Sequence, residues 1–401
     1  MRLRKCALIV MALAAASCDA PGADDAGYVT ADSAGIQIVE SLTPGWSQPA
    51  TIEPEPILSI GREEEGPHQL AAVFSAALLE DGRIAIAEAM AGEVRVFDAA
   101  GEHLLTLGGA GEGPGEFVVL TQVFAYPADS LAAFDGRLYR TTIFSLATGG
   151  YRTVPNPVEG HYAVFGVGGD GSLLLFSPGG GYRPDLEPGA QWVRSDIVSV
   201  ARDDGSGRVI TNLPDRWRAV RPDGNAPMPQ PLMHAVHAAA PDGFYWATPD
   251  RYEIRLHDGA GRVTRILRRP VEPLPVDASM IDAFVEAQLE SLRRSGREDL
   301  VPAMRARLEE EEYGSHVPVF ALAFVDRDER LWVGSPEWPF ADESVPWSVF
   351  SREGRWMGDV NVPERVRPVD ARGDAFLGIW RDELDVPHVR LYRFRSESAG
   401  G

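Results

Sequence analysis

The stretch at residues 73–87, VFSAALLEDGRIAIA, decides the fold class of this chain. It places an Asp-Gly pair between two short apolar runs. Asp-Gly supplies the positive φ angles that a tight hairpin turn requires, so the two runs are predicted to pair as antiparallel strands. A third run at 93–98 alternates polar and apolar residues, and a fourth follows at 103–107. The segment therefore predicts one four-stranded antiparallel unit.

This unit recurs along the chain. Its six hairpin turns are expected at Asp81-Gly82, Ala128-Asp129, Asp170-Gly171, Asp242-Gly243, 326–328 and Gly373-Asp374. Repetition at roughly 40–50 residues, with four strands per unit, is typical of propeller blades. We therefore expect an all-β fold, a single six-bladed β-propeller over residues 35–398. The sixth unit lacks an obvious fourth strand, which either 36–40 or 57–60 could supply to close the ring and remove its exposed edges.

One segment departs from the repeat. Between the fourth and fifth units, about 40 extra residues are inserted, at about 276–313. Apolar residues at helical spacing and Asp277 as a helix N-cap predict a first helix, and Leu300, Met304 and Leu308 mark a shorter second one. We expect this insertion to cap or flank an entrance of the central channel.

The N-terminus has the features of a processed export signal. Residues 1–18 combine a basic start, a short apolar core and the sequence Ala-Ala-Ser-Cys at 15–18, which resembles the lipobox of bacterial lipoproteins. The resemblance implies lipidation of Cys18 and a membrane-anchored protein of the bacterial cell envelope, outside the cytoplasm. An ordinary secretory signal is the alternative. Residues 19–34 are small, polar and acidic and are expected to form a flexible tether.

Composition excludes several classes of function. The cysteines are Cys6 and Cys18, so the domain after the signal has no thiol for a disulfide, for thiolate catalysis or for zinc. The single lysine is Lys5, which excludes catalysis by a Schiff-base lysine or a P-loop lysine in the mature domain. The net charge of −21 would repel a polyanion, so no nucleic-acid partner is expected.

The linker between the first two units carries a family resemblance. The string Gly-Glu-Gly-Pro-Gly-Glu-Phe at 111–117 resembles the connection between blades in NHL-repeat propellers. The segment 94–101 resembles the third strand of a blade in the same family. Its glycines allow positive φ where the chain returns to the axis. The segment 377–392 resembles the closing segment of bacterial six-bladed propeller lipoproteins. Because propellers host binding proteins, scaffolds and enzymes alike, this resemblance implies the fold and not one function.

Three histidines form the first candidate site. His161, His234 and His316 lie near the starts of innermost strands in blades three, four and five, and equivalent positions point toward one axis. Some NHL-like propellers that act as lyases hold a metal in the channel with histidines, so the resemblance implies a possible divalent metal here. The alternative is that these are hydrogen-bonded rim histidines.

Aromatic and arginine side chains in loops form the second candidate site. Trp217 and Arg218 precede blade four, and Trp338 and Phe340 lie within blade five, on the same face as the insertion. Such residues either form a recognition surface for a protein or small-molecule partner or pack beneath the inserted helices. The sequence thus favours a binding protein, with a metal-dependent hydrolase or lyase in the channel as the alternative.

Overall fold

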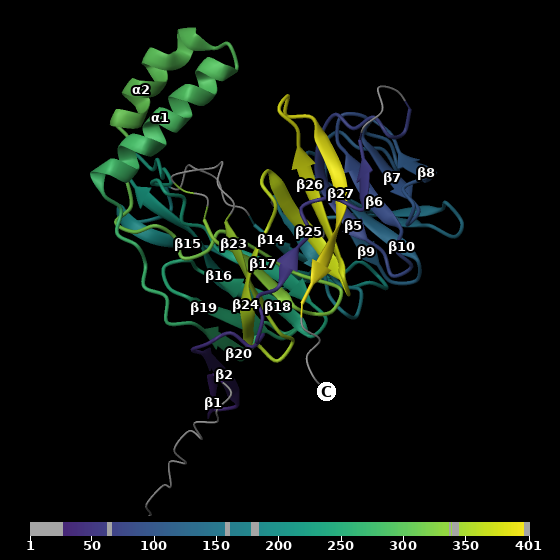
Figure 1. Cartoon of the computed structure of the whole chain (residues 1–401), viewed down its shortest axis with the longest axis horizontal. Helices are drawn as coiled ribbons and strands as arrows, with labels where there is room; N and C mark the ends of the chain where they lie inside the picture. Colours follow the sequence, from purple (N-terminus) through teal and green to yellow (C-terminus); the bar gives the residue numbers. More distant parts are fainter. Residues whose placement is uncertain are drawn as a thin grey trace, which may run out of the picture.

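The computed structural model describes residues 27–61, 66–156, 161–177, 184–336, 338 and 345–396. Six sheets surround a common axis and confirm the six-bladed β-propeller (Figure 1). The first three blades comprise β5 (Val73–Leu78), β6 (Ile84–Glu88), β7 (Glu93–Phe97) and β8 (His103–Gly108); β9 (Leu120–Tyr126), β10 (Ser130–Asp135), β11 (Arg140–Ser145) and β12 (Tyr151–Pro155); and β13 (Ala163–Val167), β14 (Leu173–Phe176), β15 (Gly189–Val200) and β16 (Gly207–Val220).

The remaining blades follow in chain order. They comprise β17 (Val236–Ala240), β18 (Gly243–Ala247), β19 (Glu253–His257) and β20 (Val263–Arg268); β21 (Leu322–Val325), β22 (Leu331–Gly334), β23 (Pro346–Phe350) and β24 (Trp356–Asn361); and β25 (Val366–Arg372), β26 (Ala375–Arg381) and β27 (Pro387–Arg395). Each innermost strand contacts the innermost strand of the next blade, and β25 contacts β5, so the ring is closed.

The predicted turns form the hairpins between the first two strands of every blade. In blade two, Ala128 and Asp129 both have positive φ, at 60° and 49°, the conformation of a type I′ turn. In blade one, Gly82 supplies a φ of 87°. All six turns therefore lie on one face of the propeller, which we call the hairpin face.

The hydrophobic core consists of layers between neighbouring blades. One cluster joins Ile84 and Ile86 of blade one to Leu377 and Ile379 of blade six, and the other five clusters each join two consecutive blades. The linker at 111–117 ends in Phe117, which is 1% exposed and packs between blades one and two. Because each blade contributes to one cluster with the preceding blade and to another with the following blade, the stability of every blade depends on both neighbours.

An N-terminal segment closes the ring along its outer edge, and we call residues 36–60 the strap. Of the two strands considered from the sequence, β4 (Leu58–Ile60) pairs with β27 and completes blade six, together with β3 (Thr51–Ile52). The other, β2 (Ile36–Ser41), runs parallel to β20 at the edge of blade four. Between them, the backbone N–H groups of Gly45 and Trp46 donate to the carbonyl groups of β24 in blade five, over 3.0 and 2.8 Å.

The tether predicted at 19–34 is wrong for its last part. Residues Tyr28–Ser33 form β1, which pairs with β2 across a turn with positive φ at Ala34 and Gly35. The alternating pattern of Tyr28–Ser33 suits an edge strand, and the free edge of β2 supplies its partner. The expected signal peptide and the lipidation of Cys18 lie outside the described residues.

The insertion is helical, as expected. Helix α1 spans Ala278–Arg294, a short 3₁₀ turn spans Glu298–Leu300, and α2 spans Val301–Glu309. The Asp277 carboxylate accepts the backbone N–H of Met280 over 2.9 Å, which confirms the N-cap. The pair stands away from the blades (Figure 1), and its fully packed side chains are Leu289 and Leu308. Within the described residues, no helix has both the length and the apolar character needed to cross a membrane.

The insertion lies on the face opposite the hairpin turns. It joins the end of β20 to the start of β21, and the strands within a blade alternate in direction. The end of an outermost strand and the start of the next innermost strand must therefore share one face, which we call the insertion face.

Candidate functional site: the central channel

The innermost strands enclose two connected cavities. The narrow cavity, of about 380 Å³, lies along the strands, and the wide cavity, of about 800 Å³, opens among the turns of the hairpin face. Residues shared by both cavities mark their junction: Ala125, Val167, Ala239, Val325 and Arg327. A continuous passage therefore leads from the hairpin face into the body of the propeller.

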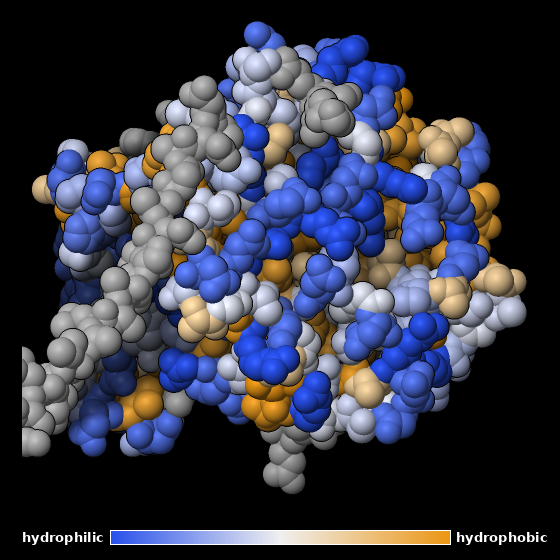
Figure 2. Space-filling model, turned by 90° about the horizontal axis from the view of Figure 1, so that it is seen from below, coloured by the Kyte–Doolittle hydropathy of each residue, from blue (hydrophilic) through white to orange (hydrophobic). Residues whose placement is uncertain are grey.

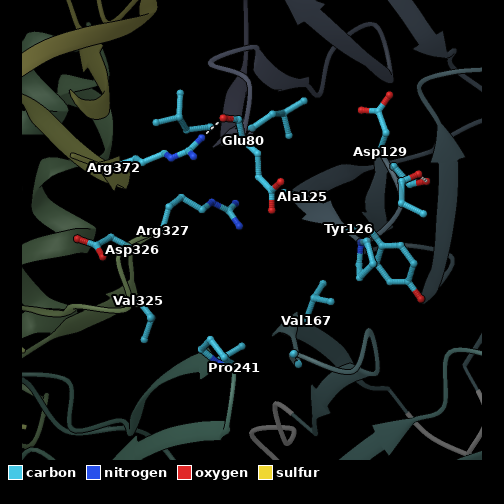
Figure 3. Close-up of a pocket in the computed structure, with 18 of the residues that line it drawn as sticks. Glu80, Ala125, Tyr126, Asp129, Val167, Pro241, Val325, Asp326, Arg327 and Arg372 are labelled. Atoms are coloured by element: carbon cyan, nitrogen blue, oxygen red, sulfur yellow. Dashed lines mark hydrogen bonds between the residues drawn. The ribbon is translucent and has the colours of Figure 1, made fainter. Parts of the chain in front are cut away.

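Arg327 stands at this junction because the turn between β21 and β22 holds its backbone. The Asp326 carboxylate accepts the backbone N–H of Asp328 and Arg330 over 3.0 and 2.9 Å, and its other oxygen accepts Trp332 Nε1 over 2.7 Å. Burial raises the pKa of the Asp326 carboxyl, against the opposing effect of Arg330. Figure 3 shows the Arg327 guanidinium pointing into the open space between Val325, Val167 and Ala125.

Asp370 fixes the Arg327 side chain from the neighbouring blade. Arg327 Nε donates to Asp370 Oδ2 over 3.0 Å. The same carboxylate accepts the backbone N–H of Leu78 in blade one over 3.1 Å and that of Ala371 over 2.9 Å. Burial raises the pKa of Asp370, while Arg327 and these N–H groups favour its charged form. With Nε bound to Asp370, the two Nη groups of Arg327 face the cavity and have no acceptor among the described residues.

A second arginine lines the narrow cavity. Arg367, on β25, donates from Nη2 to the Phe74 carbonyl over 2.6 Å. Within the described part of the chain, it has no carboxylate within ion-pair distance. The Arg367 side chain is exposed to the open cavity, and partial desolvation by the cavity walls, followed by the nearby charge of Arg381, lowers its pKa. The charged residues of the narrow cavity are thus Arg327, Arg367 and Asp370, with an excess of one positive charge.

Aromatic rings form another part of the same wall. His237 lies on β17 and stacks on Trp246, with ring centroids 5.1 Å apart. It also contacts Phe165 and Phe176, at 4.8 and 4.5 Å. Burial among these rings lowers the pKa of His237 to about 4, so its imidazole is neutral at pH 7. Phe165 and His237 both line the narrow cavity, as do Phe124, Phe324 and Trp347.

Gln122, on β9, contributes an unused acceptor. Its side chain lines the narrow cavity, and its Oε1 is buried without a hydrogen-bond partner among the described residues. A buried polar atom without a partner costs roughly 1–3 kcal/mol. This oxygen is covered by protein atoms, so the cost is borne within the fold.

Both signs of charge surround the opening of the wide cavity. Arg83 bridges Asp81 and Asp129, the turn residues of blades one and two. Arg372 donates to the Glu80 carbonyl, the dashed contact in Figure 3. Seen from below in Figure 2, hydrophilic side chains predominate on the surface and hydrophobic ones show between them.

The three predicted histidines do not combine into a metal site. His161 is exposed and stacks on Tyr139 at 4.5 Å, while His234 Nδ1 lies 3.2 Å from the Ala235 carbonyl oxygen. His316 is exposed and hydrogen-bonds Ser315. Among the residues that the structure describes, no group of three His, Cys, Asp or Glu side chains could hold a metal ion. Each histidine precedes its strand, where the local loop and not the blade symmetry directs the ring.

The predicted aromatic and arginine surface is largely engaged within the protein. Trp217 packs edge-on against Trp192, with centroids 5.6 Å apart, and Arg218 is 4% exposed, with Nη1 donating to the Ala226 carbonyl. Trp338 packs against Phe284 of α1 at 5.9 Å, so it lies beside the inserted helices. Phe340 lies outside the described residues.

Sequence reasoning missed Arg327, Asp370, Arg367, His237 and Gln122. The available signal was their position in or directly after innermost strands, where a propeller exposes side chains to its channel. This position alone does not single them out, because polar residues are common throughout this acidic chain.

Comparisons with known proteins support the fold. No protein-family model and no curated protein sequence matches the chain. A member of the DUF4221 family from Bacteroides vulgatus is 10% identical, over 87% of this chain and 99% of that one, with a TM-score of 0.51. A protein of Bacteroides fragilis proposed to be exported is 12% identical, over 84% and 93%, with a TM-score of 0.46. A streptogramin B lyase is 9% identical, over 81% and 94%, with a TM-score of 0.42.

Proposed function

We propose that this chain is a lipid-anchored binding protein of the bacterial cell envelope, outside the cytoplasm, that holds a small ligand in its central channel. The observation that carries the proposal is the pair of connected cavities with polar groups left unused at their walls. Their volumes fall in the range of about 300–1,000 Å³ that is usual for ligand pockets. The lipobox-like sequence at 15–18 supports the location.

The channel is a better candidate than the insertion face. On the insertion face, Trp338 packs on Phe284 and Trp217 packs on Trp192, so part of the surface of these rings is covered by contacts within the protein. In the channel, the Arg327 guanidinium opens into the cavity, and its Nη groups have no protein partner among the described residues. Donors that open into a cavity fix the orientation of a ligand by exchanging bound water for a ligand acceptor.

The alternative, a metal-dependent hydrolase or lyase, needs a set of metal ligands in the channel. The described residues offer no such set. Metal analysis of the purified protein tests this alternative directly. Stoichiometric zinc, iron or calcium that is lost when His161, His234 and His316 are substituted together would favour the alternative over a binding protein.

A thermal-shift screen of small molecules tests the binding proposal. Ala125 lines both cavities, and Ala125→Phe would fill their junction, whereas Ala100→Phe adds the same ring to an exposed turn. A ligand at 100 times its Kd stabilises the fold by about 2.7 kcal/mol, roughly 3 °C for a domain of this size. We expect such a shift for wild type and Ala100→Phe and not for folded Ala125→Phe. Ligands that stabilise all three proteins equally would refute a channel site.

The anchor has its own test. Cells supplied with a clickable fatty acid should label the wild-type protein and not a Cys18→Ala variant. Label that persists in Cys18→Ala would show that the lipid is attached elsewhere, and an unlabelled wild-type protein would show that the signal is an ordinary secretory one.

A further inference from the structure

We infer that the channel ligand is a small organic carboxylate with a flat apolar body, an inference that rests on the proposed function. The charge of the narrow cavity contrasts with the charge of the whole chain. The whole chain has a net charge of −21, yet the narrow cavity contains two arginines and one aspartate. The side chains of both arginines are partly exposed in this open cavity. An acidic protein that places excess positive charge in a cleft favours an anion there, because the walls of a cleft focus the electric field.

The single carboxylate in this cavity is already satisfied. Asp370 accepts Arg327 Nε and the backbone N–H groups of Leu78 and Ala371. It is 4% exposed, so its role is to hold Arg327 rather than to neutralise a second cation. Arg367 Nη2 donates to the Phe74 carbonyl oxygen, an acceptor without net charge. The charge of Arg367 is therefore left for a ligand.

The geometry of Arg327 suits a carboxylate. Its Nε is bound to Asp370, which fixes the guanidinium plane, and its two Nη groups face the cavity (Figure 3). No acceptor for these Nη groups is found among the described residues. Two parallel N–H donors match the two oxygens of a carboxylate, and such paired contacts are among the strongest hydrogen bonds in proteins.

The body of the ligand faces aromatic rings. Phe165, with Phe176 and Trp246 behind it, and the neutral imidazole of His237 form one continuous aromatic cluster. Flat rings pack well against such a wall. Charge at one end and a ring at the other thus match the two kinds of wall in this cavity.

The test compares 2-naphthoate with its neutral isostere 2-naphthamide by isothermal titration calorimetry at low salt, where charge attraction is least screened. We expect naphthoate to bind at least about tenfold more tightly than the amide. Arg367→Gln and Arg327→Gln should each reduce naphthoate affinity by about tenfold or more and leave amide binding unchanged. Arg262→Gln removes an arginine whose side chain is 80% exposed and serves as the control.

The outcomes separate this inference from the proposed function. If the acid and the amide bind equally and Ala125→Phe abolishes both, the channel is a ligand site but not one for carboxylates. If binding persists in Ala125→Phe, both proposals fall. If naphthoate does not bind to wild type, the inference falls. Arg367 has no buried partner carboxylate among the described residues, so its variant keeps the test valid even if Arg327→Gln destabilises the fold.

Discussion

Protonation of His237 should make the stability of the propeller depend on pH in a way that one substitution removes. In the folded protein the pKa of His237 is about 4, against 6.5 for an ordinary histidine. His237 therefore binds a proton below about pH 6.5 in the unfolded chain but only below about pH 4 in the folded protein. Stability from this residue is fully present above pH 6.5 and is lost as the pH falls toward 4.

The magnitude follows from the two pKa values. At pH 5, which is about 1.5 units below the pKa of the unfolded state, the loss is about 2 kcal/mol, because each unit corresponds to 1.36 kcal/mol. Cation–π attraction to Phe165, Phe176 and Trp246 would return about 0.5–1 kcal/mol to the charged form and change this value little at pH 5. His237→Phe retains an aromatic ring in the cluster and removes the titration.

Urea unfolding at pH 7.5 and pH 5 checks this prediction. The fall in unfolding free energy between the two values should be about 2 kcal/mol smaller in His237→Phe than in wild type. His316→Phe replaces an exposed histidine and should behave like wild type. Equal falls in wild type and His237→Phe would refute the burial argument, since a water-accessible imidazole would titrate alike in both states.

Three further predictions concern the ring, the site and the insertion. Trp46→Ala should lower the unfolding free energy by about 3–5 kcal/mol in urea, because Trp46 is 8% exposed and packs on Gly358 and Phe394; an unchanged midpoint would show that the strap is not stabilising. Asp370→Asn should cost about 1–3 kcal/mol, because it removes the charged acceptor of Arg327 Nε while the Arg327 side chain, 33% exposed, keeps its contact with water. A loss below about 0.5 kcal/mol would show that water already replaces the carboxylate. Replacing residues 277–314 by Asn-Gly should leave a propeller with cooperative unfolding and a β-type circular dichroism spectrum. The two ends of the insertion are already hydrogen-bonded to each other, because Val276 N–H donates to the Ser315 carbonyl over 3.0 Å and Val317 N–H to the Leu274 carbonyl over 2.8 Å. Failure of that variant to fold would make the helices structural.

The hairpins could be predicted because their information is local. Gly82, Ala128 and Asp129 have positive φ, as tight hairpin turns require, and the short apolar runs beside these turns are typical of strands. Helix α1 was predictable for the same reason, from its own spacing and from Asp277 as its cap.

Edges and channel contacts could not be predicted in this way. The strand 36–40 carries a pattern that suits any free edge, and only the assembled ring shows that blade four offers one while blade six takes 58–60. Arg327 likewise carries no local sequence signal, because the residue that orients it, Asp370, lies 43 residues later on the next blade. The symmetry of the blades fixes where each strand begins, but the local loop contacts of each histidine decide where its ring points.

Ring closure and the candidate site share one set of bonds. Asp370 belongs to blade six, takes Arg327 from blade five and accepts the Leu78 N–H of blade one, so three blades meet at this carboxylate. Blade six is also where β4 and β3 of the strap complete the sheet. A loosened ring would therefore misplace the Arg327 guanidinium before the propeller unfolds, because that side chain is oriented by a neighbouring blade and not by its own. The same dependence gives the channel a rigid arginine, and a rigid donor pair binds a carboxylate without first losing side-chain entropy.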